Sequence, residues 1–450
     1  MNAPFGRILF FAGFLAALAS SVQAQVIEFR ATITPAQETP AVTSAASGSA
    51  VLLYDVGANT FDLFVTLNSF VAPLTGSHIH DGAAGVNGPV VTNFGSEAVY
   101  VRTGNTLTGV FRNVVHGGSK LALLRNGAYL NYHTTAFPGG EIRGQLIAQP
   151  KRLSAIIDVA QEIAATPVVS NAFGGALMSY NSGTNRLLLH ITLFSFTNTL
   201  AASHFHEGAV GVNGPVVTGL GGAAAYNVSN GFINKTFDLP YTGDPIKLLT
   251  GGAYLNFHSN IYGGGEIRGQ IFAMDESPSS RLINASARGF AGTGNQVLIS
   301  GLGVTGAEPV AVRIAARGPS LTAFGVQGVL ADPTMSLYSG SGRLMASNDN
   351  HTLVSPSVIP PLLDSKESIL DVILPPGGYS VVVSGVGGAT GVALVETFEQ
   401  RRGPDSTLAL ADASPVKTSG TLSTGVATLT RAIPELCVAP MIASVVSTAR

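Results

Sequence analysis

The stretch GSHIHDGAAGVNGPVV at residues 76–91 returns as ASHFHEGAVGVNGPVV at residues 202–217, a shift of 126 positions. A second stretch, GAYLNYHTTAFPGGEIRGQL at 127–146, returns as GAYLNFHSNIYGGGEIRGQI at 252–271, a shift of 125. A near-constant shift indicates one duplicated domain of about 120 residues. We place the first copy at residues 26–149 and the second at residues 152–274.

Apolar and polar residues alternate within each copy, which is typical of strands with one buried face. The alternating apolar positions are Phe61, Leu63, Val65 and Leu67, and in the second copy Leu187, Leu189, Ile191 and Leu193. Asn87-Gly88 and Asn213-Gly214 are turn signals, each followed by Pro-Val-Val. The sequence therefore predicts an all-β fold with two tandem antiparallel β-sandwich or barrel domains.

Composition supports the same fold class and limits the function. The chain has 450 residues and 54 glycines, which favours several domains of short strands joined by tight turns. Charged residues make up only 11% of the chain and the formal net charge is −2, so no basic surface for nucleic acid is expected.

The composition changes after the second copy. Residues 281–399 again show short strand patterns separated by turns, and we expect a third domain, a different β-sandwich, in this range. Residues 401–450 are rich in Ala, Ser and Thr with weak patterning, which predicts a flexible tail. The single cysteine, Cys437, lies in this tail and excludes an intrachain disulfide.

The first 24 residues have the pattern of a signal peptide. Arg7 is followed by the apolar stretch 8–19, and Val22-Gln23-Ala24 fits the small-residue pattern of a signal-peptidase cleavage site. The alternative is a membrane anchor, but the 12 residues of the apolar stretch are too few to cross a bilayer. No later segment has 18 uninterrupted apolar residues. We therefore expect a secreted, cell-surface or periplasmic protein with no membrane span in the mature chain.

Six of the nine histidines belong to the repeat: His78, His80 and His133, then His204, His206 and His258. Residues i and i+2 of a strand point to the same face, so each His-x-His pair can present two imidazoles to one ion. If the strand that carries the third histidine pairs with the strand of the His-x-His motif, the third imidazole lies beside the other two. Three imidazoles predict a metal site suited to copper or zinc, one in each copy.

Other repeated polar residues flank these histidines. Asp81 and Glu207 could orient an imidazole ring from outside the ligand set. Arg143 and Arg268 could guide an anion towards the metal, or could form an ion pair on the same strand face with Glu141 and its counterpart. The alternative for the histidines themselves is a purely structural, hydrogen-bonded role.

The repeated motifs resemble those of chordin-type (CHRD) domains. They are the Ala-Gln-Glu start, His-x-His-Asp/Glu-Gly, Asn-Gly-Pro-Val-Val, Ala-Tyr-Leu-Asn-Tyr/Phe-His and Gly-Gly-Glu-Ile-Arg-Gly-Gln, and together they cover a little over half of the chain. The resemblance implies an extracellular module of the kind found in animal growth-factor antagonists and in bacterial secreted proteins.

Two looser similarities concern the site and the third domain. The order of His78, His80, His133 and Arg143 is similar to that in copper/zinc superoxide dismutases, which are β-sandwiches. The bridging histidine, the zinc site and the disulfide of those enzymes have no counterpart, so a mononuclear site matches better than dismutation. Residues 281–399 resemble pre-peptidase C-terminal domains of bacterial secreted proteins at 317–321, 331–338 and 374–379.

Three functions remain open at this point. The first is an exported binding protein with a three-histidine metal site, of the copper type, in each repeat. The second is an extracellular interaction or matrix protein with structural histidines and an unidentified protein or surface partner, and the third is a redox enzyme. No nucleophile elbow, phosphate-binding loop or zinc-protease helix motif occurs, so no catalytic residue is predicted and binding is favoured over catalysis.

Overall fold

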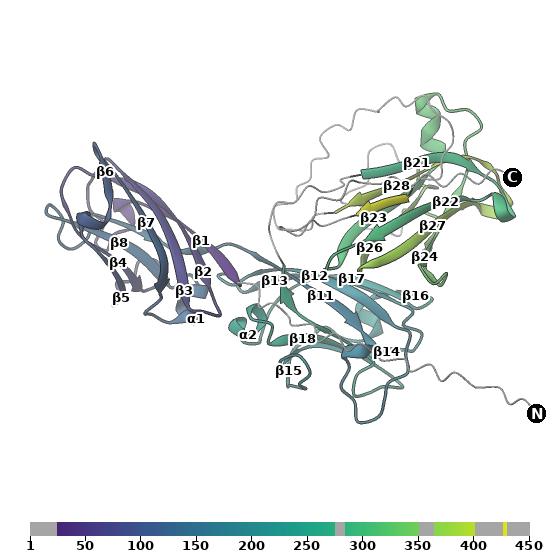
Figure 1. Cartoon of the computed structure of the whole chain (residues 1–450), viewed down its shortest axis with the longest axis horizontal. Coiled ribbons are helices and arrows are strands. Elements are labelled where there is room, and N and C mark those ends of the chain that lie inside the picture. The colour runs from purple at the N-terminus through teal and green to yellow at the C-terminus, as the bar shows by residue number, and fades with distance from the viewer. Residues whose placement is uncertain (1–24, 275–283, 351–363, 401–425, 430–450) are drawn as a thin grey trace, which may run out of the picture.

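The computed structural model describes residues 25–274, 284–350 and 364–400, together with the backbone of residues 426–429. These residues form three β units. The two repeated domains lie end to end and the third domain lies against the second (Figure 1). The structure is almost all β with antiparallel sheets, which confirms the predicted fold class.

The first domain is a sandwich of a six-stranded sheet, β10-β1-β2-β3-β7-β6, and a four-stranded sheet, β5-β4-β8-β9. The apolar residues predicted to share one strand face are buried between the sheets. Its elements are β1 (Val26–Ile33), β2 (Ser47–Asp55), β3 (Thr60–Asn68), β4 (Leu74–Asp81), β5 (Val90–Gly95), β6 (Val101–Thr103), β7 (Thr106–Val115), α1 (Lys120–Leu124), β8 (Ala128–Thr134), β9 (Ile142–Gln145) and β10 (Ile147–Ala148).

The second domain repeats this arrangement, with one difference at the seam between the two sheets. Asp158 of β11 pairs with Arg268 of β19, which joins the sheets into one, whereas the first domain has only an isolated bridge between Thr34 and Arg143. The elements are β11 (Lys151–Asp158), β12 (Phe173–Asn181), β13 (Arg186–Phe194), β14 (Leu200–Glu207), β15 (Val216–Gly219), β16 (Asn227–Ser229), β17 (Phe232–Pro240), α2 (Pro245–Leu249), β18 (Ala253–Ser259), β19 (Ile267–Gln270) and β20 (Phe272–Ala273).

The third domain packs a four-stranded sheet, β21-β28-β23-β26, on a five-stranded sheet, β25-β24-β27-β22-β29. β29 lies within the range for which the sequence predicts a flexible tail, and it pairs in parallel with β22. The elements are β21 (Asn284–Ala291), β22 (Leu298–Val304), β23 (Val310–Arg317), β24 (Pro333–Ser339), β25 (Leu344–Asn348), β26 (Ser368–Leu374), β27 (Gly377–Gly385), β28 (Gly391–Glu399) and β29 (Val426–Leu429).

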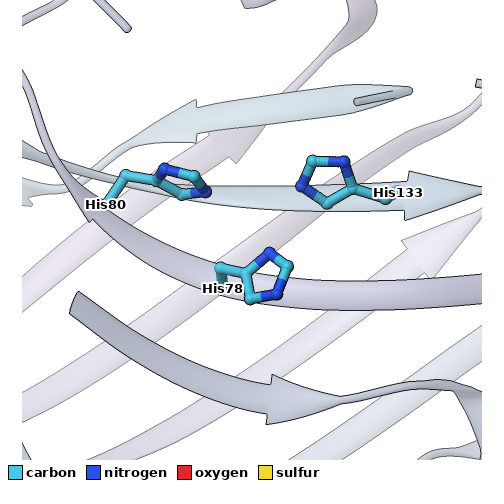
Figure 2. A group of neighbouring side chains, drawn as sticks. All are labelled: His78, His80 and His133. Atoms are coloured by element: carbon cyan, nitrogen blue, oxygen red, sulfur yellow. The ribbon is translucent and has the colours of Figure 1, made fainter. Parts of the chain in front are cut away.

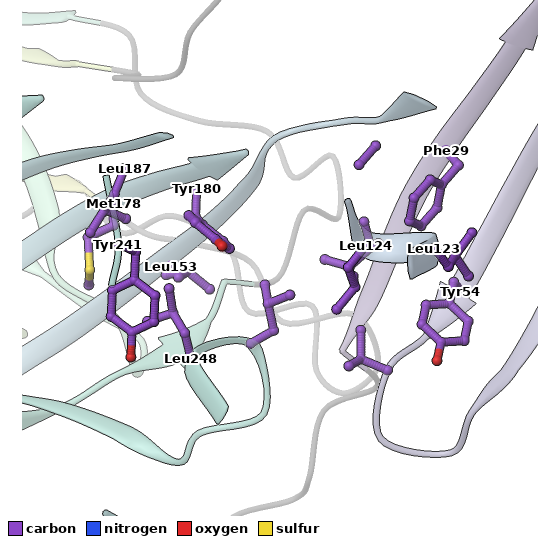
Figure 3. Close-up of a cluster of buried hydrophobic side chains, with 14 of the residues drawn as sticks. Phe29, Tyr54, Leu123, Leu124, Leu153, Met178, Tyr180, Leu187, Tyr241 and Leu248 are labelled. Carbon is purple, nitrogen blue, oxygen red and sulfur yellow. The ribbon is translucent and has the colours of Figure 1, made fainter. Parts of the chain in front are cut away.

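The two repeats share one continuous hydrophobic core. Side chains around α1 of the first domain face those around α2 of the second across the boundary, including Leu124 and Leu248 (Figure 3). Arg125 adds a hydrogen bond of 2.9 Å from Nη1 to the carbonyl oxygen of Ser182. β10 ends at Ala148 and β11 begins at Lys151, so only two residues connect the domains.

The third domain covers the outer face of one sheet of the second domain. Phe194 is buried in the core of the third domain, and the backbone N–H of Ile373 donates to Oγ1 of Thr192 at 3.1 Å. The first domain has the exposed, polar Asn68 at the position of Phe194. Only the second repeat therefore carries the aromatic side chain that enters the third domain at this point.

Several predictions fall outside the described residues. They are the signal peptide at 1–24 and the tail, including Cys437, apart from the backbone of β29. Among the described residues, none of the helices is both long and apolar enough to span a membrane.

Candidate metal centre

The six repeated histidines lie on the outer faces of the two smaller sheets. In the first domain β4 pairs with β8, with His78 opposite Asn131 and His80 opposite Tyr129. The intervening Ile79 is fully buried on the core side, because successive residues of a strand point to opposite faces. His133 lies on the same outer face of β8, two residues beyond Asn131. The strand pairing that the sequence analysis assumed is therefore present.

The three imidazole rings converge in each domain. Ring centroids are 5.6 Å apart for His78 and His80, 5.0 Å for His78 and His133, and 6.4 Å for His80 and His133. Figure 2 shows the rings gathered around one small space. One nitrogen from each ring lies within 4.8 Å of the others, both here and in the second trio, formed by His204, His206 and His258.

Hydrogen bonds assign a role to the ring nitrogens of His80 and His133 in the first domain. Nδ1 of His80 lies 2.9 Å from the carbonyl oxygen of Gly88, and Nδ1 of His133 lies 3.0 Å from that of Pro138. A carbonyl oxygen only accepts, so these Nδ1 atoms carry the proton and the Nε2 atoms keep a free lone pair. The buried Nε2 atoms of His80 and His133, and Nδ1 of His78, have no hydrogen-bond partner among the described residues.

The second domain repeats this pattern atom for atom. Nδ1 of His206 bonds to the carbonyl of Gly214 at 2.9 Å, and Nδ1 of His258 to that of Gly263 at 3.1 Å. The unpartnered buried atoms in the described chain are again Nδ1 of the first histidine and Nε2 of the other two. Two diverged copies thus leave the same three ring nitrogens without a hydrogen-bond partner among the described residues.

The environment favours the neutral form of four of the six imidazoles. Burial lowers the pKa of His78 and of His80 below the usual value, and the neighbouring histidines lower both further. The same causes lower the pKa of His204 and of His206. A neutral imidazole is the form that binds a metal ion, so these four rings are in the binding form at neutral pH.

Arg143 contacts the loop that follows β4 and, through Tyr129, the ring of His80. Its Nη2 donates to the carbonyl oxygens of Ala83 and Val86 at 2.9 and 3.0 Å, and its guanidinium lies 3.4 Å over the ring of Tyr129. Tyr129 stacks on His80 with centroids 4.8 Å apart. Arg268, Tyr254 and His206 form the same column in the second domain, at 3.4 and 4.9 Å. Both arginines are buried, so their role in the structure is to hold the loop and the tyrosine ring in place.

The carboxylates predicted to orient the rings make other contacts. Oδ2 of Asp81 accepts from the backbone N–H of Ser119 at 2.8 Å, and Glu207 accepts from the backbone N–H of Asp244 and from Nζ of Lys247. They follow the His-x-His pairs by one residue, on the other face of the strand. The ring hydrogen bonds described above run instead to backbone carbonyls.

The predicted ion pair with Glu141 is also replaced by other contacts. Glu141 accepts from Oγ of Ser44 and Oγ1 of Thr134 at 2.6 and 2.7 Å. The charged group acting on Arg143 is instead Glu38, which lies in the turn after β1. Sequence spacing cannot reveal this partner, because the two residues are brought together only by the fold.

Glu38 and Asn131 are residues that the sequence analysis did not assign to the site. Both are buried, and Oε1 of Glu38 and Oδ1 of Asn131 have no hydrogen-bond partner among the described residues. Burial raises the pKa of Glu38 to about 7, against the opposing effect of Arg143. Glu162 and Asn256 repeat the arrangement. The recurring Ala-Gln-Glu and Ala-Tyr-Leu-Asn motifs were the signals available for them.

Comparison with protein families gives two matches to the CHRD domain, over residues 29–146 and 153–271. These matches together span just over half of the chain. No curated protein sequence matches the chain.

Solved structures give weak likenesses. A pre-peptidase C-terminal domain of collagenase from Bacillus anthracis is 13% identical, over 27% of this chain and 99% of that chain, with a TM-score of 0.18. The exo-β-1,3-galactanase of Phanerochaete chrysosporium is 8% identical, over 82% and 95%, with a TM-score of 0.15.

Proposed function

Since the chain belongs to the CHRD-domain family, we propose that it is an exported binding protein whose two repeats each hold one metal ion, copper in the first place, on three histidines. The tandem β-sandwich domains support a binding or interaction role. The donor atoms are Nδ1 of the first histidine and Nε2 of the other two.

The observation that carries the proposal is the set of unpartnered lone pairs. A buried polar atom left without a hydrogen bond costs about 1–3 kcal/mol, so a purely structural trio would be expected to satisfy these atoms. Instead, two of the three rings are held by a backbone carbonyl on one nitrogen and leave the other nitrogen free. A metal ion at the centre would accept all three lone pairs.

The chemistry of the donors narrows the choice of metal. Calcium and magnesium bind through oxygen atoms, whereas imidazole nitrogen suits copper and zinc. The donor set therefore fits copper or zinc, and three ligands leave room for a further ligand from solvent.

Metal content of protein purified without a histidine tag tests the proposal. We expect about two copper ions per wild-type chain. The variant His78→Ala/His80→Ala/His133→Ala should bind one, and the further change of His204, His206 and His258 to Ala should abolish binding. His190, which bonds to Thr236 outside both trios, provides the control, since His190→Gln should leave the content unchanged. Equal metal content in the wild type, the triple variant and the sixfold variant would refute the proposal.

Export is tested separately. Residues 1–24 have the pattern of a signal peptide, and we propose that the mature chain begins at Gln25. Amino-terminal sequencing of the protein recovered outside the cytoplasm should read Gln-Val-Ile-Glu. Recovery of a chain that starts at Met1 would contradict export by this route.

A second candidate function, an extracellular interaction protein, is favoured by exposed valines. Two valines that follow each His-x-His pair are 50 to 55% exposed: Val86 in the loop and Val90 at the start of β5, and in the second repeat Val212 and Val216, the latter at the start of β15. Apolar side chains retained at the surface of both copies are typical of contact sites. Replacing all four with Ser should lower adsorption to an apolar resin while leaving the metal content unchanged. Unaltered adsorption would count against this candidate.

A further inference from the structure

We propose that each three-histidine site prefers monovalent copper over divalent ions, because the charges fixed around it oppose a second positive charge. The inference rests on the proposed function and goes further, since it names the charge state of the ion. It follows from three features of the site: an uncharged donor set, a buried guanidinium on its flank, and an incompletely charged counter-ion.

The donor set brings no negative charge. All three donors are imidazole nitrogens, and the two trios of the described chain contain neither a carboxylate nor a cysteine. Carboxylate and thiolate ligands neutralise part of the charge of a divalent ion, whereas neutral imidazoles do not offset that charge. The surroundings of the rings therefore decide how well a second positive charge is tolerated.

The charge on the flank is the guanidinium of Arg143. It lies 3.4 Å from the ring of Tyr129, and that ring lies 4.8 Å from the ring of His80. The charge is thus within about 8 Å of the imidazole, a range over which buried charges interact appreciably. Arg143 is only 1% exposed, so water screens it little. An arginine stays protonated at any ordinary pH, which makes this a fixed charge.

The counter-charge is Glu38. Its carboxylate acts on Arg143, but burial holds its pKa near 7, so near neutral pH a substantial fraction carries a proton. The guanidinium is therefore only partly neutralised. In the second repeat Glu162 acts on Arg268, which is also 1% exposed and lies 3.4 Å over the ring of Tyr254. Both sites are therefore flanked by a buried, fixed positive charge that disfavours a dication.

The test compares dissociation constants for Cu⁺ and Cu²⁺ in the full chain with the second site removed by His204→Ala/His206→Ala/His258→Ala. Cu⁺ is measured without oxygen, under ascorbate, by competition with a chromogenic chelator, and Cu²⁺ is measured in air. Zn²⁺ serves as a divalent ion without redox chemistry. The readout is the preference ratio, the Kd for the divalent ion divided by the Kd for Cu⁺.

Charge variants give opposite expected shifts. Arg143→Gln should lower the preference ratio about tenfold, the effect of removing one partly screened charge at this range. Arg143→Lys keeps the charge without the planar stack and should keep the ratio, even if both ions bind more weakly. Glu38→Gln, measured at pH 8 where the carboxyl is ionised, should raise the ratio.

A merely structural role of Arg143 would weaken both ions by the same factor and leave the ratio unchanged, and that result would overturn the inference. So would a ratio in Glu38→Gln that moves in the same direction as in Arg143→Gln. Failure of the proposed function has a different outcome, since neither Cu⁺ nor Cu²⁺ would then bind the wild-type chain.

Discussion

Gly140 offers a sharp test of how the repeat is built around its site. Its φ is 128°, a conformation that residues with a side chain rarely adopt. An added Cβ would lie 2.7 Å from Oε1 of Glu38 and 2.8 Å from Oδ1 of Asn131, closer than real Cβ contacts. Backbone strain of about 1–3 kcal/mol and overpacking of about 1–3 kcal/mol combine, so Gly140→Ala should destabilise the first repeat by about 2–6 kcal/mol.

Gly139 is the matched control for this substitution. It lies next in the chain, has no atom within 4 Å of its added Cβ and no positive φ, so Gly139→Ala should change stability by about 0.5 kcal/mol or less. Native-state hydrogen exchange of the metal-free chain, read on peptides covering β8 and β9, measures the opening free energy of the first repeat. The peptides of β18 and β19 serve as an internal reference.

In Gly140→Ala, exchange that requires opening of the first repeat should speed up by about 30-fold or more, while the second repeat is unaffected. Equal exchange in the two alanine variants would refute the view that Glu38 and Asn131 are packed against this backbone. Because no metal is present, the result is independent of the metal proposal.

Three further predictions concern pH, domain docking and the core of the third domain. Because burial holds the pKa values of His78 and His80 below the usual range for histidine, metal bound at pH 7 should be released only in acidic solution, where protons occupy these nitrogens; a metal-retention titration measures this, and loss above pH 7 would contradict it. Phe194→Ala should weaken docking of the third domain by about 3–5 kcal/mol, seen as faster proteolysis between the domains, whereas Asn68→Ala at the equivalent exposed position should have no such effect. Asp371→Ala should destabilise the third domain by about 3–5 kcal/mol in denaturant unfolding, because the guanidinium of buried Arg313 loses the carboxylate that lies 2.6 Å from its Nη2, and Arg313→Met/Asp371→Leu should restore most of the loss.

Much of the fold could be predicted from the repeat and the strand pattern. The shift of the His-x-His motif reveals the duplication, and the alternation around Phe61 and Leu63 identifies core-facing strands. The histidine trio was predictable for the same reason, because side chains two residues apart share a strand face whatever the details of packing. These features depend on local spacing, which the sequence contains.

The parts that escaped prediction depend on contacts between distant segments. The carbonyl of Gly88 selects the free nitrogen of His80, and Glu38 reaches Arg143 from a turn about 100 residues earlier in the chain. Asp81 is adjacent to the histidine pair in sequence, yet the alternation of the strand sends its carboxylate to the backbone of Ser119. Nearness in sequence was a poor guide here, because a strand separates neighbouring side chains onto opposite faces.

The two-residue connection between Ala148 and Lys151, combined with the shared core, has a consequence for measurement. Two domains on a long linker would sample many separations, but these two repeats hold their histidine trios at a single spacing. With Cu²⁺ in both trios, pulsed dipolar spectroscopy should therefore give one narrow distribution of the distance between the two ions. A partner that spans both repeats would have to match that length.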